Sequence, residues 1–351
     1  MVDTGKAGID YQGAIAGLSL GELEELVQGL GHKAFRAKQI YHWIYQRQAT
    51  GMEEMTNLPR ALREQLSDFR FWPWKIVIRR GSVDGTVKLL LEAIDGSQVE
   101  TVAIPEGNRT TVCVSTQVGC AMGCTFCATG QLGFARNLTS QEILGQVLLA
   151  RAATGRQITN VVYMGMGEPL LNYDAVLGSI ALLNDPQGLA IGMRHITIST
   201  CGIVPGIYRL AKERLQLVLA ISLHSADQRR RQEMMPVAKA YPLPELIEAC
   251  RCYVQETGRR ITFEYTLIAG VNDSLESAAQ LAQLISGLAC HVNLIPINPV
   301  GGTGFSRSKE GSVVRFARYL EEEGVSVTIR KERGTDIEAA CGQLRGSPRL
   351  N

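Results

Sequence analysis

The sequence predicts an α/β fold in which a full or partial (β/α) barrel follows a small N-terminal α+β region. Two observations predict it. Apolar, β-branched segments alternate with helical patterns from about residue 106 to residue 345, as in parallel sheets whose strands are joined by helices. This part of the chain, roughly 230 residues long, is close to the usual size of such a barrel. An open doubly wound sheet remains the alternative.

The chain before the barrel has two kinds of pattern. Residues 18–70 are helical in character: Ser19 stands three residues before Glu22, as in a capping box, and apolar residues recur at helical spacing in 33–47 and 57–69. The period then changes to two, which predicts strands at 75–80, 86–94, 98–105 and 109–116. We expect a helical accessory domain (1–75), a β extension (76–105) and the barrel domain (106–345).

Within the barrel region, the apolar runs and the helical patterns can be assigned in order. Strands are predicted at 160–169, 195–202, 217–225, 261–270, 291–300 and 325–331. Helices are predicted between them, among others at 140–153, 243–256, 274–288 and 312–324. No internal repeat interrupts this alternation.

Composition excludes several classes of protein. Of 351 residues, 45% are hydrophobic and 20% are charged, which is ordinary for a globular protein. The first residues lack a basic segment followed by an apolar one, and no apolar run is long enough to span a membrane. Nine cysteines are an odd number in a long chain, which argues against a disulfide framework. We therefore expect free thiols and a cytoplasmic location. The net charge of +2 is too small to indicate nucleic-acid binding by itself.

Three cysteines within eight residues form the most informative motif. Cys120, Cys124 and Cys127 have the short spacing by which thiolates bind iron–sulfur clusters, usually four to a cluster. With only three, one iron of a cubane keeps an open position, which is typical of a catalytic metal site. Zinc is the alternative, with a fourth ligand from Cys201, Cys250, Cys252, Cys290 or a histidine. Zinc sites, however, more often consist of two cysteine pairs.

Polar residues stand at the ends of the predicted strands, where barrel enzymes collect their chemistry. Each of them alone can be a loop-capping residue, but agreement between five strand ends indicates a shared ligand pocket. Glu168 follows two glycines, which let a backbone approach a ligand closely, and its carboxylate suits an ammonium group. The strand-end residues are the cysteine loop, Gly165, Gly167, Glu168, Ser199, Thr200, Ser222, His224 and Asn298.

These motifs resemble the radical S-adenosylmethionine (radical SAM) enzymes, and within them the adenosine RNA methyltransferase branch of the RlmN/Cfr type. The stretches that carry the resemblance are CVSTQVGCAMGCTFCATGQLGF, VVYMGMGEPLLN, ITISTCG, AISLHS, LIPINP and RKERGTDIEAACGQL, within residues 98–345. The cysteine motif alone indicates the superfamily, whereas ACGQL together with Cys113 indicates the branch. The resemblance implies a partial TIM-type radical SAM barrel with an N-terminal RNA-binding domain.

The resemblance also implies roles for individual residues. Cys120, Cys124 and Cys127 would hold a [4Fe-4S] cluster, whose open iron takes the amino and carboxylate groups of SAM. Cys341 would carry the methyl group, Cys113 would resolve the intermediate through a disulfide, and Glu100 would deprotonate it. Plain packing remains the alternative for both cysteines, and a water-facing side chain for Glu100. The residues implied to line the SAM pocket are Gly167, Glu168, Ser199, Ser222, Leu223, His224 and Asn298.

The implied reaction explains why cysteines are needed. Carbon 2 of adenine is too electron-poor to attack the methyl of SAM, whereas a thiolate is a good nucleophile. Cys341 would take a methyl from one SAM. A radical from a second SAM would activate that methyl for addition to the ring, and Cys113 would release the product by forming a disulfide with Cys341.

The resemblance implies partners and leaves three other functions open. The partners would be 23S rRNA, at the peptidyl-transferase centre, tRNA next to the anticodon, and an electron donor such as flavodoxin or ferredoxin, with the enzyme a monomer. One open function is methylation of adenine at C8 by the same branch. Another is a non-catalytic, metal-stabilised RNA-binding protein. The third is a radical SAM enzyme that acts on proteins or small molecules.

Basic and aromatic side chains supply candidate RNA contacts, although most exposed basic residues are only solvated. At least one of Tyr41, Trp43 and Tyr45 is expected in the core rather than stacked on a base. The basic candidates are Lys33, Arg36, Lys38, Arg229, Arg230, Arg231, Arg307, Lys331, Arg333 and Arg345.

Overall fold

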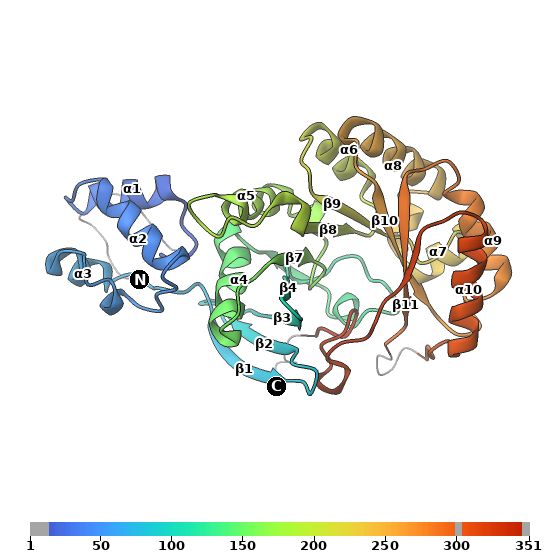
Figure 1. Cartoon of the computed structure of the whole chain (residues 1–351), viewed down its shortest axis with the longest axis horizontal. Coiled ribbons are helices and arrows are strands. Elements are labelled where there is room, and N and C mark those ends of the chain that lie inside the picture. The colour runs from blue at the N-terminus through green and yellow to red at the C-terminus, as the bar shows by residue number, and fades with distance from the viewer. Residues whose placement is uncertain (1–13, 299–303, 346–351) are drawn as a thin grey trace.

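A computed structural model of the chain describes residues 14–298 and 304–345. The N-terminal segment on which the absence of an export signal rests, and the last two residues of the predicted strand 291–300, lie outside the described residues. Three helices lie at one end of the molecule, and a long curved sheet with helices on its outer side forms the rest (Figure 1). None of the helices in the described ranges is long and apolar enough to cross a membrane.

The N-terminal helices α1 (Leu20–Gly29), α2 (Phe35–Tyr45) and α3 (Arg60–Leu66) pack on one another. The predicted capping box is confirmed, because Ser19 and Glu22 bond each other's backbone amides at 3.2 and 2.7 Å. Tyr41 and Tyr45 are buried, which confirms that aromatic residues of this helix belong to the core. The helices are attached to the sheet domain through polar contacts: the Tyr41 hydroxyl donates to Asp185 at 2.6 Å, and Arg151 donates to the Tyr45 carbonyl at 2.8 Å.

The four strands predicted after the helices are confirmed as an antiparallel meander. They are β1 (Lys75–Gly81), β2 (Val87–Glu92), β3 (Gln98–Glu106) and β4 (Arg109–Cys113). The fourth strand ends at Cys113 rather than at the predicted residue 116. β4 also pairs in parallel with β7, so the meander continues directly into the barrel sheet.

The parallel strands follow one another around the sheet in chain order. They are β7 (Asn160–Tyr163), β8 (Ile196–Thr200), β9 (Val218–Ser222), β10 (Ile261–Leu267), β11 (Cys290–Pro296) and β12 (Val327–Ile329). A doubly wound sheet reverses its strand order at a switch point, and this order never reverses. No pairing joins β12 back to β1 within the described ranges. The prediction of a partial barrel is therefore confirmed.

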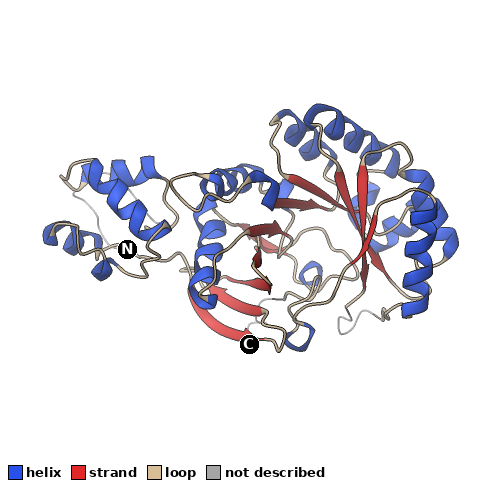
Figure 2. Cartoon of the chain, in the orientation of Figure 1, coloured by secondary structure: helices blue, strands red, loops and turns tan. Residues whose placement is uncertain are grey.

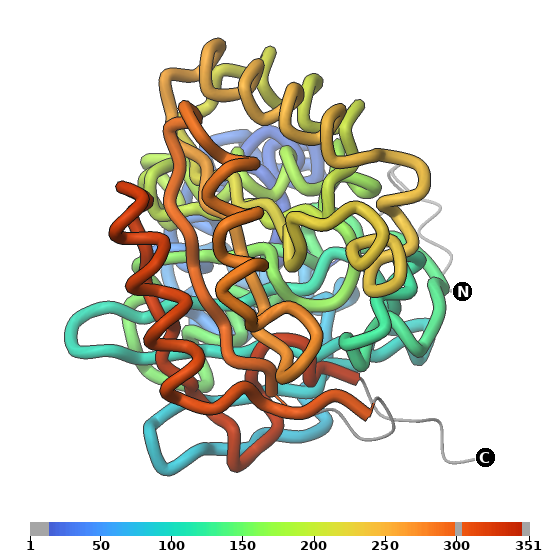
Figure 3. Tube along the Cα trace, turned by 90° about the vertical axis from the view of Figure 1, so that its right-hand side faces the viewer, coloured from blue at the N-terminus to red at the C-terminus, as the bar shows by residue number. Residues whose placement is uncertain are grey.

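Helices cover the outer side of the parallel strands (Figure 2). The helices predicted by pattern are α4 (Ser140–Thr154), α8 (Leu243–Thr257), α9 (Leu275–Leu284) and α10 (Glu310–Glu322). Three more, α5 (Tyr173–Asn184), α6 (Val204–Lys212) and α7 (Gln228–Met234), complete the connections. A view from the side shows the last helices packed in a row against the sheet, with the C-terminal segment passing below it (Figure 3).

The cysteine loop is framed by two short strands that the sequence did not predict. β5 (Gln117–Gly119) and β6 (Phe134–Asn137) form a separate antiparallel pair. Gly119 has a φ of +74°, and a Cβ there would lie 1.9 Å from the Gly133 carbonyl oxygen. The amide of Cys120 donates to that same carbonyl at 2.7 Å. Only glycine at position 119 lets the two strands close the loop at its first cysteine.

Thr139→Ala tests the start of α4, the helix that follows the cysteine loop. The Thr139 hydroxyl accepts the Glu142 amide at 3.1 Å, and Glu142 bonds the Thr139 amide at 2.9 Å. Loss of one half of this capping box should lower the free energy of unfolding by about 1 kcal/mol. Urea denaturation followed by circular dichroism measures it. Thr56→Ala, at an exposed threonine, is the control. Equal losses in the two variants would contradict the capping role.

Candidate active site

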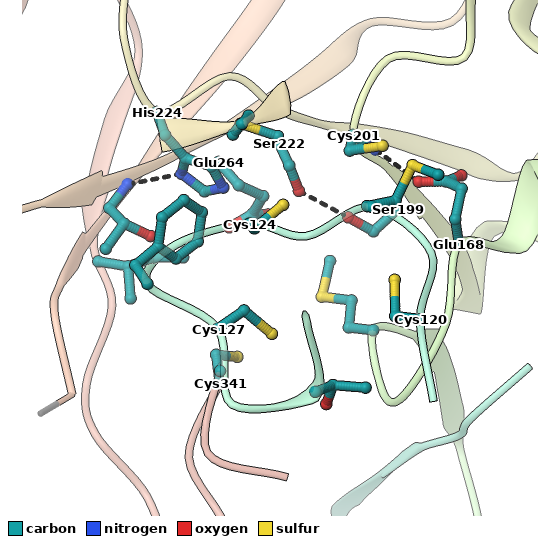
Figure 4. A pocket seen from close by; sticks show the side chains of 18 of the residues that line it. Cys120, Cys124, Cys127, Glu168, Ser199, Cys201, Ser222, His224, Glu264 and Cys341 are labelled. Carbon is teal, nitrogen blue, oxygen red and sulfur yellow. Dashed lines mark hydrogen bonds between the residues drawn. The ribbon is translucent and has the colours of Figure 1, made fainter. Parts of the chain in front are cut away.

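A cavity of about 170 Å³ lies at the C-terminal ends of the parallel strands (Figure 4). The cysteine loop, the ends of β7 to β11 and the C-terminal loop all contribute to its wall. Ten of the predicted site residues border it: Cys120, Cys124, Cys127, Gly167, Glu168, Ser199, Ser222, His224, Asn298 and Cys341. Leu223, Cys113 and Glu100 do not. Residues from separate strand ends therefore share one pocket.

The three loop cysteines approach this cavity from one turn of chain. The Cys127 amide donates to the Cys124 carbonyl at 3.1 Å, and the Thr125 amide donates to the Met234 carbonyl at 3.0 Å, which ties the loop to α7. Burial raises the pKa of Cys120 to about 11 and that of Cys124 further, so both are neutral thiols unless a cation is bound. A metal centre that binds here would have to displace the protons of these thiols.

The donor set fits a cubane cluster. In residues 14–298 and 304–345, no group of three His, Cys, Asp or Glu side chains could hold a single metal ion. A cubane places each thiolate on a separate iron, so its ligands surround a volume instead of converging on one point. Three thiols around one cavity supply this arrangement. Glu168 and Ser199 lie on the same side of the cavity as Cys120, away from Cys127 and Cys341 (Figure 4).

Glu168 is held rigidly by backbone amides. Its side chain is buried, with one carboxylate oxygen accepting the Leu170 amide at 3.0 Å and the other accepting the Cys201 amide at 2.7 Å. Its own amide donates to Gln117 at 2.9 Å. Burial raises the pKa of Glu168, while these hydrogen bonds oppose the shift. The φ of +100° at Gly167 explains why a glycine precedes it. Two backbone amides therefore fix the orientation of a carboxylate that lines the cavity.

His224 is a neutral hydrogen-bond donor at the cavity wall. Its Nδ1 accepts the Thr266 amide at 3.0 Å, so the tautomer that makes this bond carries its proton on Nε2. Burial, aided by Arg231, lowers the pKa of His224 to about 3. Phe126 of the cysteine loop packs against the ring edge to face, with centroids 4.8 Å apart. On the neighbouring strand ends, the hydroxyls of Ser199 and Ser222 lie 3.4 Å apart.

Leu223, expected among the pocket residues, lies in the core instead. Its side chain is fully buried and borders neither cavity described here. Its amide donates to the Glu264 carbonyl at 3.0 Å, and its carbonyl accepts Arg231 Nε at 3.2 Å. In this structure the residue fixes the end of β9 rather than presenting its side chain to a ligand.

The C-terminal loop is bonded directly to the cysteine loop. The Ala128 amide donates to the Gly342 carbonyl at 2.8 Å, and the Thr129 hydroxyl donates to the Leu344 carbonyl at 2.6 Å. Asn298 adds a longer contact from its side-chain amide to the Cys341 carbonyl at 3.4 Å. Cys127 and Cys341 consequently enter the cavity from the same side (Figure 4).

A second cavity of about 360 Å³ adjoins the first and brings the other predicted cysteine into the site. Cys113, at the end of β4, borders only this second cavity, whereas Cys341 borders both. Burial raises the pKa of Cys113 to about 12. Both residues are free thiols here. Cys341 therefore stands between a pocket on the cluster side and a pocket that contains the second thiol.

Glu100 is buried in an ion pair beside these cavities. It lies 3.1 Å from Lys88, and its other oxygen accepts the Arg345 amide at 2.8 Å. Both side chains are less than a tenth exposed. The alternative that Glu100 faces water is therefore wrong, because the C-terminal loop covers β3 at this point. Lys88 also donates to the Glu338 carbonyl at 3.0 Å, which anchors the same loop.

Three side chains at the cavities escaped the sequence reasoning. Glu264 on β10 borders the first cavity, accepts from Asn293 at 3.0 Å, and has its pKa raised by burial. Arg330, directly after β12, borders both cavities and lies 3.9 Å from Glu264. Electrostatic attraction to Cys341 raises the pKa of Arg330. Cys201, considered above only as a possible zinc ligand, is buried in the core and borders the cavity, and its amide donates to Glu168 at 2.7 Å. A carboxylate inside the apolar run ITFEYTL was the available signal for Glu264.

The prediction that Arg231 contacts RNA is wrong, because this side chain is buried. It is only 1% exposed and therefore unable to meet a phosphate, whereas Lys33, Lys38 and Lys331 are exposed. The helical turn places Arg231 on the inner face of α7, while the side chain of Arg229 on the same helix is 90% exposed.

Comparison with known proteins assigns both parts of the chain. Residues 114–282 match the radical SAM superfamily, and residues 14–70 match the ribosomal RNA large subunit methyltransferase N-terminal domain. A probable dual-specificity RNA methyltransferase RlmN from Geobacillus kaustophilus (strain HTA426) is 50% identical over 340 residues, 96% of this chain and 93% of that protein. A protein of the same name from Thermosynechococcus vestitus is 49% identical over 94% of this chain and 98% of its own length.

A solved structure agrees with these relatives. The crystal structure of a radical SAM methyltransferase from Sphaerobacter thermophilus superimposes with a TM-score of 0.92 at 48% identity. The match covers 95% of this chain and 100% of that one.

His224→Asn tests the neutral histidine. The unfolded chain takes up a proton at this side chain as the pH falls below about 6.5, whereas the folded chain does so only near pH 3. The free energy of unfolding should therefore fall by up to about 1.4 kcal/mol per pH unit across that window. Asparagine can still accept the Thr266 amide and tolerates the φ of +56° at this position.

The variant should lose this part of the pH dependence. Urea denaturation of the metal-free protein between about pH 7 and about pH 5 measures it. His42→Asn, at an exposed histidine of α2, is the control and should follow the wild type. If the free energy of unfolding changed with pH equally in wild type and His224→Asn, the lowered pKa of His224 would be contradicted.

Proposed function

Because the chain belongs to the RlmN family of radical SAM RNA methyltransferases, we propose that it converts adenosine to 2-methyladenosine in 23S rRNA and in tRNA next to the anticodon. The observation that carries this proposal is the position of Cys341. Its side chain borders both the cavity of the cluster cysteines and the cavity that contains Cys113. A methyl carried on this thiol would have an activating cofactor on one side and a substrate base on the other.

The cofactors of this family are a [4Fe-4S] cluster and SAM, and the donor set of the first cavity suits both. Cys120, Cys124 and Cys127 would hold the cluster. When bound, it supplies the electron that cleaves SAM. Glu168 would bind the ammonium group of SAM, because its carboxylate is fixed by two amides and aims at the cavity. The neutral imidazole of His224 would donate its Nε2 proton to the same ligand, with Ser199, Ser222 and Asn298 as further polar contacts.

The two remaining thiols would act in sequence. The Cys341 thiolate would take a methyl from SAM by displacement, which its exposure to the cavity permits. Arg330 borders both cavities together with Cys341 and would place a positive charge beside the reaction. Burial favours the protonated form of Cys113. In the adduct, the Cys113 sulfur would lose its proton and attack the Cys341 sulfur; the bond between Cys341 and the former methyl carbon would break, its electron pair would stay on that carbon, and protonation of the carbon would complete the methyl group. The protein thereby separates methyl acceptance from product release.

Glu100 is our proposed base for the ring proton. It is bonded to the amide of Arg345, four residues after Cys341, so it lies against the loop that carries the adduct. Lys88 holds its other oxygen at 3.1 Å. To reach a substrate ring, the carboxylate would have to leave the Arg345 amide. RNA binding that breaks the Arg345 contact alone, with the bonds of Gly342 and Leu344 kept, would free it.

The second cavity is the proposed site of the target base. Chemistry on a ring carbon requires the base to leave its stack. Arg109, Lys331 and Arg333 stand at the rim of this cavity, where they can meet phosphates beside the extruded nucleotide. Lys33 and Lys38 of the N-terminal domain are exposed and extend the basic surface. We propose residues 1–75 as the accessory RNA-binding domain.

The remaining assignments are also proposals. We place the enzyme in the cytoplasm as a monomer, reduced by a flavodoxin or ferredoxin. Nine unpaired thiols and RNA substrates suit a reducing compartment.

Nucleoside analysis tests the reaction. The anaerobically reconstituted protein, given SAM and reductant, should convert unmodified 23S rRNA and tRNA fragments to products that contain 2-methyladenosine. Mass spectrometry of the digested RNA, against synthetic 2- and 8-methyladenosine, identifies the isomer. Detection of the 8-methyl isomer alone would overturn the C2 assignment. A colourless protein that does not cleave SAM would overturn the proposal that the protein is a radical SAM enzyme.

Cys113→Ala tests the order of the thiols. Without the resolving thiol, RNA should remain covalently attached to Cys341 and migrate with the protein on a denaturing gel. Cys341→Ala should form neither the adduct nor the product, and Cys252→Ala, at a thiol outside both cavities, should behave as wild type. Full turnover by Cys113→Ala would contradict its role.

A further inference from the structure

Arg231 is a buried cation without a carboxylate partner. It is 1% exposed, and its guanidinium donates only to main-chain carbonyls: Nη2 to Cys201 at 2.7 Å and Nε to Leu223 at 3.2 Å. Nη1 is buried and has no hydrogen-bond partner among residues 14–298 and 304–345. In the described part of the chain, no Asp or Glu oxygen lies within ion-pair distance of it. Burial lowers the pKa of Arg231, as expected for a charge removed from water.

This cation lies directly behind the wall of the first cavity. Its two carbonyl acceptors follow β8 and β9, whose ends carry Ser199 and Ser222 into the pocket. Three residues later in α7, the Met234 carbonyl accepts both the amide and the hydroxyl of Thr125, at 3.0 and 3.3 Å. Thr125 is the residue next to Cys124. One short helix thus connects the cysteine loop to two strand ends through Arg231 and Met234.

An unpaired buried charge is costly unless an opposite charge compensates it. Cluster binding brings that charge, because the loop cysteines must ionise to become ligands. Arg231 is placed to supply the compensating charge, because it bonds the carbonyl of Cys201, and Cys201 lines the same cavity as Cys124. In a poorly polarisable interior this attraction is strong, and it grows when the cluster takes up an electron.

We propose that Arg231 is a positioning residue for the cluster and SAM, whose buried charge raises the reduction potential of the cluster. This inference rests on the proposed binding of a [4Fe-4S] cluster by Cys120, Cys124 and Cys127. The one-electron reduction of that cluster, with dithionite as the electron source, adds negative charge beside the guanidinium. The charge therefore eases the step that starts the reaction, while the two carbonyl contacts hold the strand ends that receive SAM.

Arg151 provides a matched control. It is also buried, it also donates to two carbonyls, those of Tyr45 and Ile44 at 2.8 and 3.0 Å, and burial likewise lowers its pKa. It lies in α4 against the N-terminal helices and borders neither cavity. Replacing it tests the general cost of losing a buried guanidinium.

The experiment is an anaerobic, EPR-monitored redox titration of the reconstituted proteins without SAM. Arg231→Met should lower the equilibrium constant for cluster reduction at least tenfold, which is a potential about 59 mV more negative. Arg231→Lys keeps the charge and should stay within threefold of wild type, and Arg151→Met should match wild type. Iron and sulfide content and urea denaturation report loading and folding separately.

Each outcome decides the proposal. Arg231→Met with full iron and a wild-type potential overturns it, as does a loss that Arg231→Lys does not rescue. Should Arg231→Met fail to load iron, loading by Arg231→Lys supports the charge role, and failure of both variants contradicts it. A wild-type protein that binds no cluster is a different result: it overturns the proposed function, and this inference with it.

Discussion

The hydrogen bonds between the cysteine loop and the C-terminal loop are the contacts on which the site depends. Thr129 and Leu344 are 215 residues apart in sequence, yet their 2.6 Å bond and the neighbouring bond from Ala128 to Gly342 hold Cys341 beside the loop cysteines. No strand of the described residues carries Cys341, so its position depends on the contacts of the loop that holds it. The second cavity lies between this loop and strands β3 and β4, and Lys88 of β2 and Glu100 of β3 anchor the loop.

The continuous sheet explains how four distant segments meet. Because the antiparallel meander pairs with the first parallel strand, Cys113 at the end of β4 lies one strand from the loop that carries Glu168. The same pairing brings β3, and with it Glu100, under the C-terminal loop. A barrel domain alone would lack this wall, so the extension belongs to the chemistry as well as to the fold.

Periodicity and motif spacing predict much of this, and the misses have physical reasons. The parallel strands and the pocket residues at their ends follow from alternation, because strand ends meet at one edge of a sheet. Glu264 was missed since a polar residue in an alternating strand looks solvent-facing, whereas here that face lines the inside of a partial barrel. Arg231 was misjudged because three consecutive arginines look alike, and only the packing of α7 decides which one turns inward. Cys341 stands in an irregular loop, and only the resemblance to a family identified it.

The cysteine loop and the C-terminal loop stabilise each other. The Gly342 and Leu344 carbonyls cap donors of Ala128 and Thr129, directly after the last cysteine of the triplet. A truncation upstream of Gly342 would keep every strand of the sheet and all three cysteines. It would nevertheless leave those donors unsatisfied and open the cavity toward solvent and oxygen. The tail that carries Cys341 would therefore also shield the proposed cluster from oxygen.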